Sequence, residues 1–305
     1  MSKTRSIVPA VVCGFLAFAC VGPLADDTTS TGVPEHAAEI RLIVQGDDIG
    51  CAHAVNEAVI HCHREGILTT TEVMVPCAWF EEAARFLNEN PKIEVGVHLT
   101  LTSEWDLCKW RPLTDAPSLV DKNGYFYPQT REWGRWPPGT GFFDAKPKRE
   151  EVEKELRAQI ELARKKIKRV THVTSHMGTA TCRPDLRELV LKLAREYGLR
   201  ADLADPEARK KHGLRGLRGF GGFDTPWQER EKLLVAALEK LEPGNWLLLE
   251  HPGFDRPELK GMGHPGYENV AEHREGVTRL FTSPKVKEVI QRRGIRLISY
   301  SDLPE

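Results

Sequence analysis

The chain has 305 residues, of which 40% are hydrophobic and 29% are charged. This composition is ordinary for a soluble globular protein, and the length allows one large domain with a substantial core. The 43 basic and 44 acidic residues nearly cancel, so the chain has no excess of positive charge for a nucleic acid or an anionic membrane. We therefore expect no nucleic-acid partner, and the balance fits a neutral or weakly charged small substrate.

The first 25 residues have the pattern of an export signal. Lys3 and Arg5 precede an almost wholly apolar run at 7–21, and Ala17-Phe18-Ala19 places small residues before a cleavage site. The apolar run is shorter than the roughly 20 residues that a membrane-spanning helix requires. We therefore predict a signal peptide at 1–25 and export to the periplasm or the extracellular space.

Cys20 follows the predicted cleavage site, so processing to a lipoprotein tethered to the membrane at this cysteine is an option, although the preceding residues match a lipobox poorly. An uncleaved N-terminal anchor is the alternative. Residues 26–38 are polar and are expected to form a flexible tether, which leaves 39–305 as the folded domain. The five cysteines outside the signal are odd in number and show no CxxC spacing, which favours buried free thiols over disulfides.

Short apolar runs alternate with amphipathic segments from residue 39 onward. Strands are expected at 39–46, 70–75, 94–101, 170–175, 199–203, 246–249 and 295–300. Helices are expected at 55–64, 79–88, 148–168, 184–197, 228–241 and 284–293. This alternation predicts an α/β fold of βα units around about seven parallel strands in a single domain. A distorted, incompletely closed TIM-like (β/α) barrel is the expected architecture, with an open doubly wound sheet as the alternative.

Three long stretches, 102–147, 204–226 and 252–283, are predicted to be irregular. Long loops in a compact domain are usually functional, and in a (β/α) barrel the loops that follow strands cover the active-site face. The first stretch is rich in aromatic residues, and these either stack on sugar rings or pack the loop on itself: Trp105, Trp110, Tyr125, Tyr127, Trp133 and Trp136.

Acids and histidines recur where the predicted strands end. Asp47 and Asp48 close the first strand, His98 lies near the end of the third, His176 follows the fourth and His251 follows the sixth. The carboxyl ends of parallel barrel strands share one mouth, so these residues are expected to meet there.

The pleat of the third strand supports this arrangement. Val95, Val97 and Leu99 alternate with Gly96 and His98, so one face packs on helices and the other carries His98 toward the barrel interior. On the fourth strand, His172 and His176 share a face but stand about 13 Å apart at roughly 3.3 Å per residue. The two histidines therefore cannot both bind one ion unless the strand bends, and His172 is interpreted as a structural residue or as one that supports the metal ligands without binding the metal.

One carboxylate and two imidazoles form a plausible open site for a divalent metal ion, which polarises a carbonyl group and lowers the pKa of water. A second carboxylate can accept the proton of that water, and a further histidine can protonate a leaving nitrogen. The inventory is typical of amide hydrolysis. Magnesium and zinc both stay open, with two imidazoles favouring zinc or another transition metal.

Six segments in this order resemble the YdjC-like carbohydrate deacetylases, which include chitooligosaccharide deacetylases. They are Gln45-Gly46-Asp47-Asp48-Ile49-Gly50, Gly66-Ile67-Leu68-Thr69-Thr70-Thr71, Gly96-Val97-His98-Leu99-Thr100-Leu101-Thr102, Thr171-His172-Val173-Thr174-Ser175-His176, Glu250-His251-Pro252-Gly253-Phe254-Asp255, and the tail from Gly294 to Leu303.

The resemblance implies a distorted TIM-like barrel and removal of N-acetyl groups from small or oligomeric amino sugars with one Mg²⁺ or Zn²⁺ ion. It implies that Asp48, His98 and His176 bind the metal, that Asp47 is the general base and that His251 is the general acid. Another metal-dependent reaction, on a different amide, an ester or a phosphate, is one alternative, and a non-catalytic glycan-binding barrel is another.

Three positions depart from the family pattern. Thr174 stands where family members commonly have an aspartate, which removes an expected carboxylate beside the metal ligands. Gly178 stands where they often have a histidine, a difference expected to affect the pocket or the choice of substrate. Ile49 replaces a phenylalanine, an exchange of one apolar residue for another.

Overall fold

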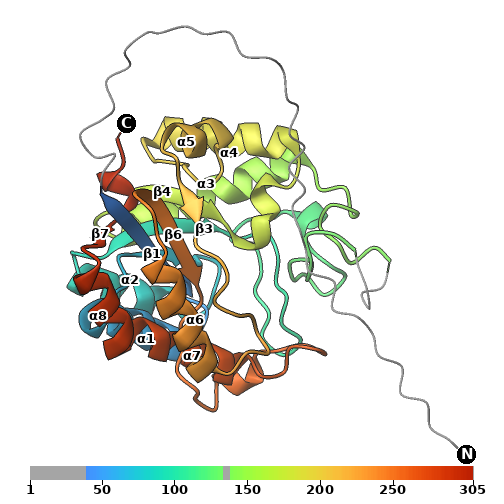
Figure 1. Ribbon diagram of the computed structural model, residues 1–305. Helices are drawn as coiled ribbons and strands as arrows, with labels where there is room; N and C mark the ends of the chain where they lie inside the picture. Colours follow the sequence, from blue (N-terminus) through green and yellow to red (C-terminus); the bar gives the residue numbers. More distant parts are fainter. Residues whose placement is uncertain (1–38, 133–137, 305) are drawn as a thin grey trace, which may run out of the picture. The chain divides into compact units, whose positions relative to one another are not determined.

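The computed structural model describes residues 39–132 and 138–304. The predicted signal peptide (1–25) with Cys20, the predicted tether (26–38), and Trp133 and Trp136 lie outside the described residues. Strands and helices alternate along the described chain (Figure 1).

The strands are β1 (Ile40–Ile49), β2 (Thr70–Val73), β3 (Glu94–Leu99), β4 (His172–Ser175), β5 (Arg215–Gly216), β6 (Gly244–Glu250) and β7 (Arg296–Ile298). The α-helices are α1 (His53–Glu65), α2 (Phe80–Glu89), α3 (Arg149–Lys166), α4 (Pro184–Tyr197), α5 (Pro206–Lys211), α6 (Trp227–Glu239), α7 (Val270–Thr282) and α8 (Pro284–Arg292). Short 3₁₀ helices are η2 (Pro117–Leu119), η3 (His176–Thr181), η4 (Leu259–Gly261) and η5 (Tyr300–Asp302).

The seven strands form one parallel sheet in the order β4-β3-β2-β1-β6-β5, with β7 also paired to β1. Strand β6 pairs along one edge of β1, and the other edge is shared by β7, at the start of β1, and β2, at its end. Among the described residues β4 and β5 do not pair, so the curled sheet stays open between them. The prediction of a distorted, incompletely closed barrel is confirmed.

The two faces of the sheet differ in character, as the pleat predicts. Val95, Val97 and Leu99 of β3 are buried in the main hydrophobic core, which the surrounding helices complete. A second, smaller apolar cluster fills the start of the barrel interior and includes Ile43 of β1 and Tyr300. Beyond this apolar floor, the interior becomes polar toward the carboxyl ends of the strands, where the site lies.

Helix ends show why these segments are helical. Helix α3 carries two glutamates in its first turn and three basic residues in its last, which complements the helix dipole. Helix α4 begins with Pro184 at its first turn and ends at Gly198, whose φ of 64° is the left-handed conformation of a common C-cap.

The fifth strand predicted at 199–203 is wrong. Arg200 makes one isolated bridge to His172, after which the amides of Ala204 and Asp205 bond to the carbonyl of Ala201 and turn the chain. The fifth strand is instead the two-residue β5. The predicted loop at 204–226 thus holds this strand and α5, whose first turn is capped by the Asp205 side chain.

The prediction that 252–283 is entirely irregular is also wrong, because α7 occupies Val270–Thr282. The buried face of this helix includes His273, Arg274 and Thr278, so its sequence lacks a clean apolar period. Gly276 in the middle of the helix lowers its helix propensity further, but it packs closely against Trp227 of α6.

The stretch at 102–147 is irregular apart from η2, as predicted, in the residues that the structure describes. Trp105 and Trp110 are buried in the core, which supports packing of the loop rather than stacking on a sugar. The five described cysteines are all free, three of them buried. Within the described ranges, no helix is long and apolar enough to cross a membrane.

Candidate active site

The carboxyl ends of four strands bring the predicted site residues together. Asp47 and Asp48 come from β1 and His98 from β3, while His176 begins η3 directly after β4 and His251 follows β6. Asp48, His98 and His176 each offer a ligand atom, and these atoms all lie within 4.8 Å of one another. All three side chains are buried.

A bulge in β1 explains how two consecutive aspartates reach the same site. Neighbouring residues of a regular strand point to opposite faces. The pairing of β1 with β2 shifts between Gly46 and Ile49, and Asp48 has a φ of 74°. Aspartate is among the few non-glycine residues that adopt this left-handed conformation readily, and the bulge turns Asp48 toward the histidines beside Asp47.

The geometry around Asp48 fits a divalent cation. Its Oδ1 atom lies 3.6 Å from Nε2 of His98 and 3.4 Å from Nδ1 of His176, yet this buried oxygen has no hydrogen-bond partner among the described residues. A buried carboxylate oxygen without a partner is costly unless something else pairs with it. One carboxylate and two imidazole nitrogens are the donor set of an open zinc or related metal site.

Each of the two histidines is held through its other ring nitrogen. Nδ1 of His98 is 2.7 Å from Oγ1 of Thr174, and Nε2 of His176 is 3.0 Å from Oε2 of Glu104. If these outer nitrogens carry the protons, the lone pairs of the inner nitrogens face Asp48. Such partners orient the histidines that bind metals in proteins.

The pKa values show how charge is distributed around these nitrogens. Burial and the neighbouring His176 lower the pKa of His98 to about 3, so its ring is neutral, as a metal ligand must be. Burial alone would lower the pKa of His176, but the carboxyl groups of Glu104 and Asp48 raise it to about 10. The negative potential that favours this proton also favours a cation.

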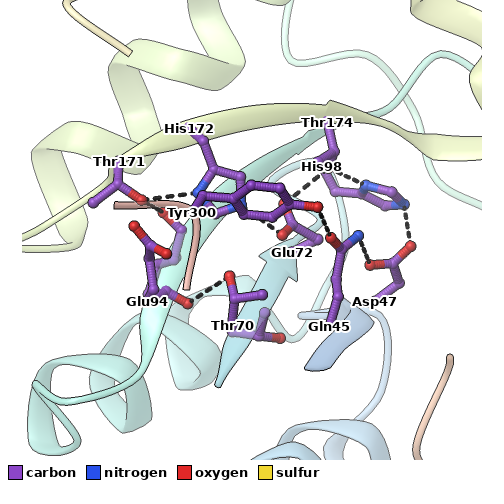
Figure 2. A network of polar contacts seen from close by, with 12 residues as sticks. Gln45, Asp47, Thr70, Glu72, Glu94, His98, Thr171, His172, Thr174 and Tyr300 are labelled. Carbon is purple, nitrogen blue, oxygen red and sulfur yellow. Dashed lines mark hydrogen bonds and ion pairs between the residues drawn. The ribbon is translucent and has the colours of Figure 1, made fainter. Parts of the chain in front are cut away.

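Asp47 lies beside the cluster and is positioned by a chain of hydrogen bonds. Its Oδ1 accepts from Nε2 of Gln45 at 2.7 Å, and the hydroxyl of Tyr300 donates to Oε1 of the same glutamine at 2.7 Å (Figure 2). Burial, together with Glu72 and Asp48, raises the pKa of Asp47 well above its usual value. A raised pKa suits a carboxyl group that accepts a proton near neutral pH.

His251 faces Asp47 from the outer side of the site. Its Nε2 lies 4.0 Å from Oδ2 of Asp47, and 35% of its side chain is exposed, so this ring reaches both the site and solvent. Burial lowers the pKa of His251, with Arg274 adding to this effect and Asp48 opposing it.

Three charged residues of the site were missed by the sequence analysis. Arg274 of α7 binds Asp48, Glu104 binds His176, and Glu72 of β2 lies in the polar network of Figure 2. Glu72 had one visible signal, because a charged residue inside a short, otherwise uncharged strand needs a buried partner. His172, interpreted as a structural residue or as a support for the ligands, lies outside the cluster of Asp48, His98 and His176 and pairs with Glu72.

A cavity of about 150 Å³ adjoins Asp47 and His98. Its lining combines polar groups of the site with small and apolar side chains: Gln45, Asp47, His98, Thr174, Ser175, Gly178, Thr181, Leu203, Ala204 and Leu249. Gly178, one of the departures noted in the sequence, has a φ of 68°, and open space surrounds its α-carbon where a side chain would stand.

Comparisons with known proteins agree with this architecture. The chain is 43% identical over 264 residues to a Thermus thermophilus protein named carbohydrate deacetylase, covering 82% of this chain and 89% of the relative. It is 30% identical to a chitooligosaccharide deacetylase of Yersinia enterocolitica, covering 87% of this chain and 99% of that protein.

Among solved structures, one from Enterococcus faecalis V583, described as a candidate cellobiose-phosphate cleavage protein, superposes with a TM-score of 0.69 at 29% identity. The superposition covers 86% of this chain and 98% of that one. A family model described as YdjC-like protein matches residues 41–292, so the chain belongs to the YdjC-like family.

Proposed function

We propose that this protein is a metal-dependent carbohydrate deacetylase that removes N-acetyl groups from small or oligomeric amino sugars. The observation that carries the proposal is the cluster of Asp48, His98 and His176, in which a buried carboxylate oxygen without a hydrogen bond faces two imidazole nitrogens. The family and the names of its curated relatives support carbohydrate deacetylation as the reaction.

In this proposal Asp48, His98 and His176 hold one divalent ion, either Mg²⁺ or Zn²⁺. A bound divalent ion polarises the acetyl carbonyl and makes water more acidic. The two nitrogen donors favour zinc or another transition metal over magnesium.

Asp47 and His251 divide the proton transfers of amide hydrolysis. Asp47 accepts a proton from the attacking water, and its raised pKa suits this role. His251 donates a proton to the sugar nitrogen as the C–N bond breaks, which releases acetate and a free amine. The lowered pKa of His251 makes its protonated form a stronger acid toward this leaving group.

The cavity beside Asp47 suits a small acyl group. At about 150 Å³ it is well below the size of a pocket that encloses a drug-sized ligand. Leu203, Ala204 and Leu249 would provide apolar contacts for a methyl group, while the sugar ring would remain outside this cavity, beside the partly exposed His251.

The decisive experiment measures acetate release from N-acetylglucosamine and its short oligomers, with and without a chelator. We expect release that the chelator abolishes and that added metal restores. A protein that binds zinc but releases no acetate from any of these sugars would favour another acylated substrate, or glycan binding without catalysis. Release that persists after the metal is removed would contradict the assignment of the site.

We further propose that the protein acts outside the cytoplasm, on the strength of the signal-like pattern of residues 1–25. Its partner there is an N-acetylated sugar, and contact with a membrane is expected only if Cys20 is lipidated. N-terminal sequencing of the protein from fractionated cells tests this. A cytoplasmic protein with residues 1–25 intact would refute it.

A further inference from the structure

A row of three residues crosses neighbouring strands below the cluster of Asp48, His98 and His176. Glu72 of β2 is paired in register with Gly96 of β3, which is paired in turn with His172 of β4. Because Gly96 has no side chain, the carboxyl group of Glu72 reaches across β3 and contacts Nε2 of His172 at 2.7 Å (Figure 2). A Cβ atom at position 96 would overlap both Oε2 of Glu72 and Nε2 of His172.

The second oxygen of Glu72 reaches His98 indirectly. Oγ1 of Thr174 donates a hydrogen bond of 2.8 Å to Oε2 of Glu72. A threonine hydroxyl has one hydrogen, so at its 2.7 Å contact with Nδ1 of His98 the same oxygen must accept. Nδ1 of His98 therefore carries a proton, and the lone pair of Nε2 faces Oδ1 of Asp48, 3.6 Å away.

The opposite direction of the hydrogen bond between Thr174 and His98 would leave a buried group unpaired. If Thr174 donated to His98, Oε2 of Glu72 would lose this hydrogen bond in a side chain that is fully buried. Leaving a buried charged oxygen unsatisfied costs more than the hydrogen bond gained elsewhere. The carboxyl group of Glu72 thus decides which way the threonine hydroxyl points.

We propose that Glu72 is a positioning residue that acts through Thr174 to hold His98 in the tautomer with Nε2 free for the metal. The inference rests on the proposed function only in taking His98 as a metal ligand. It also assigns a role to Thr174 of β4, since the threonine hydroxyl passes on the effect of a carboxyl group from β2, on the other side of β3.

The test is the affinity of the full chain, stripped of metal, for zinc ion alone, measured by competition with a chromophoric chelator. Outer partners of metal-binding histidines typically change metal affinity by about 10- to 100-fold. We expect a loss of this size for Glu72→Gln and for Thr174→Val, which removes the hydroxyl at nearly constant volume. Thr174→Ser keeps the hydroxyl and is expected to bind zinc nearly as tightly as the wild type.

Two further variants separate a relay from general damage to the barrel. Because Glu72 acts through Thr174, the double variant Glu72→Gln/Thr174→Val should bind zinc no more weakly than Thr174→Val alone. Glu231→Gln is the matched control, since Glu231 is also a buried acid but bonds to Ser283 and Lys285, outside this network. It should leave zinc affinity unchanged.

The outcomes distinguish the relay from the proposed function. Wild-type affinity in both Glu72→Gln and Thr174→Val, in a protein that binds zinc and releases acetate, would overturn the relay alone. Additive losses in the double variant would also overturn it. Failure of the wild type to bind either zinc or magnesium would overturn the proposed function. If Glu72→Gln does not fold, the comparison of Thr174→Val with Thr174→Ser tests the proposal. Equal zinc affinities of these two variants would refute the role of the threonine hydroxyl.

Discussion

Arg274 donates a hydrogen bond of 2.6 Å to Oδ2 of Asp48, which leaves the other carboxylate oxygen to face the two histidines. Burial alone would raise the pKa of Asp48, but Arg274 and the nearby histidines outweigh it and hold this pKa well below its usual range. Asp48 is therefore a carboxylate at any pH at which the enzyme is expected to work. A side chain from α7, far from Asp48 in sequence, thus maintains the negative charge of the proposed metal ligand.

Replacing Arg274 with methionine should destabilise the metal-free protein strongly. Removing one partner of a buried ion pair typically costs about 3–5 kcal/mol, because the remaining charge is left uncompensated. Saturating zinc should recover part of this loss, because a dication replaces the missing positive charge beside Asp48. Urea unfolding of the metal-free and zinc-loaded variant measures both effects.

Arg279→Met is the matched control on the same helix. Arg279 is half exposed and pairs with Glu275, so its replacement should change the free energy of unfolding by about 0.5 kcal/mol or less. Equal stability of Arg274→Met and the wild type without metal would show that Arg274 does not compensate the charge of Asp48.

Replacing either of the two adjacent aspartates should impair a different property of the protein. Asp47→Asn should reduce acetate release by about 100-fold or more, since it removes the proposed general base, while zinc binding persists. Asp48→Asn and His98→Gln should instead weaken zinc binding itself. Parallel measurements of zinc affinity and of kcat at saturating zinc separate these effects, with Asp106→Asn in the exposed loop as a control. Full activity in Asp47→Asn would remove Asp47 from the role of base.

The strand ends and the pleat of β3 made much of this arrangement predictable. The alternation of residues 94–101 correctly placed His98 on the interior face, and the parallel topology placed Asp47, His176 and His251 at the same mouth. Strict alternation, however, would have put Asp47 and Asp48 on opposite faces. The left-handed conformation of Asp48 brings them together, and a short motif does not reveal such a bulge.

The sequence did not reveal the charged residues that contact the proposed metal ligands, for a different reason. Glu72, Glu104 and Arg274 lie in separate segments, and their proximity to the histidines and to Asp48 depends on register and on loop paths. At Thr174 the sequence indicated the loss of a carboxylate beside the ligands. The structure shows that the Thr174 hydroxyl bonds both His98 and the carboxyl group of Glu72. Glu72 lies on β2, and the sequence near Thr174 does not reveal that these two strands approach each other.

The pair of His172 and Glu72 should make stability depend on pH. Burial opposes protonation of His172, but Glu72, Glu94 and Asp202 outweigh it and raise its pKa above the usual value of about 6.5. A raised pKa in the folded state means that the stabilising contribution is complete below about pH 6.5 and is lost as the pH rises through the folded-state pKa. The ring also bonds Thr171 through Nδ1, as a doubly protonated imidazole can.

His172→Gln should therefore differ from the wild type most at low pH. We expect the difference in the free energy of unfolding between the two proteins to be largest near pH 6 and to shrink steadily toward pH 9. Urea titrations of the metal-free proteins at these pH values measure it, and subtracting the two proteins cancels the titrations that they share. A difference that stays constant over this range would show that His172 is neutral in the folded protein.

Gly96 offers a test of the whole network through one methyl group. Alanine at this position would place Cβ against the facing atoms of Glu72 and His172, so the two side chains would have to separate or the strands would have to shift. Overpacking of this kind typically costs about 1–3 kcal/mol, and the loss is larger if the buried pair breaks.

Displacing Glu72 would also release Thr174 and hence His98, so zinc affinity should fall along with stability in Gly96→Ala. Gly216→Ala in β5 is the matched control, because a Cβ atom there meets no other atom within 4 Å. It should change neither property appreciably. Gly96→Ala could instead lower stability but bind zinc like the wild type. The Glu72 carboxyl group would then not control His98, since the methyl group would have displaced Glu72 without affecting His98.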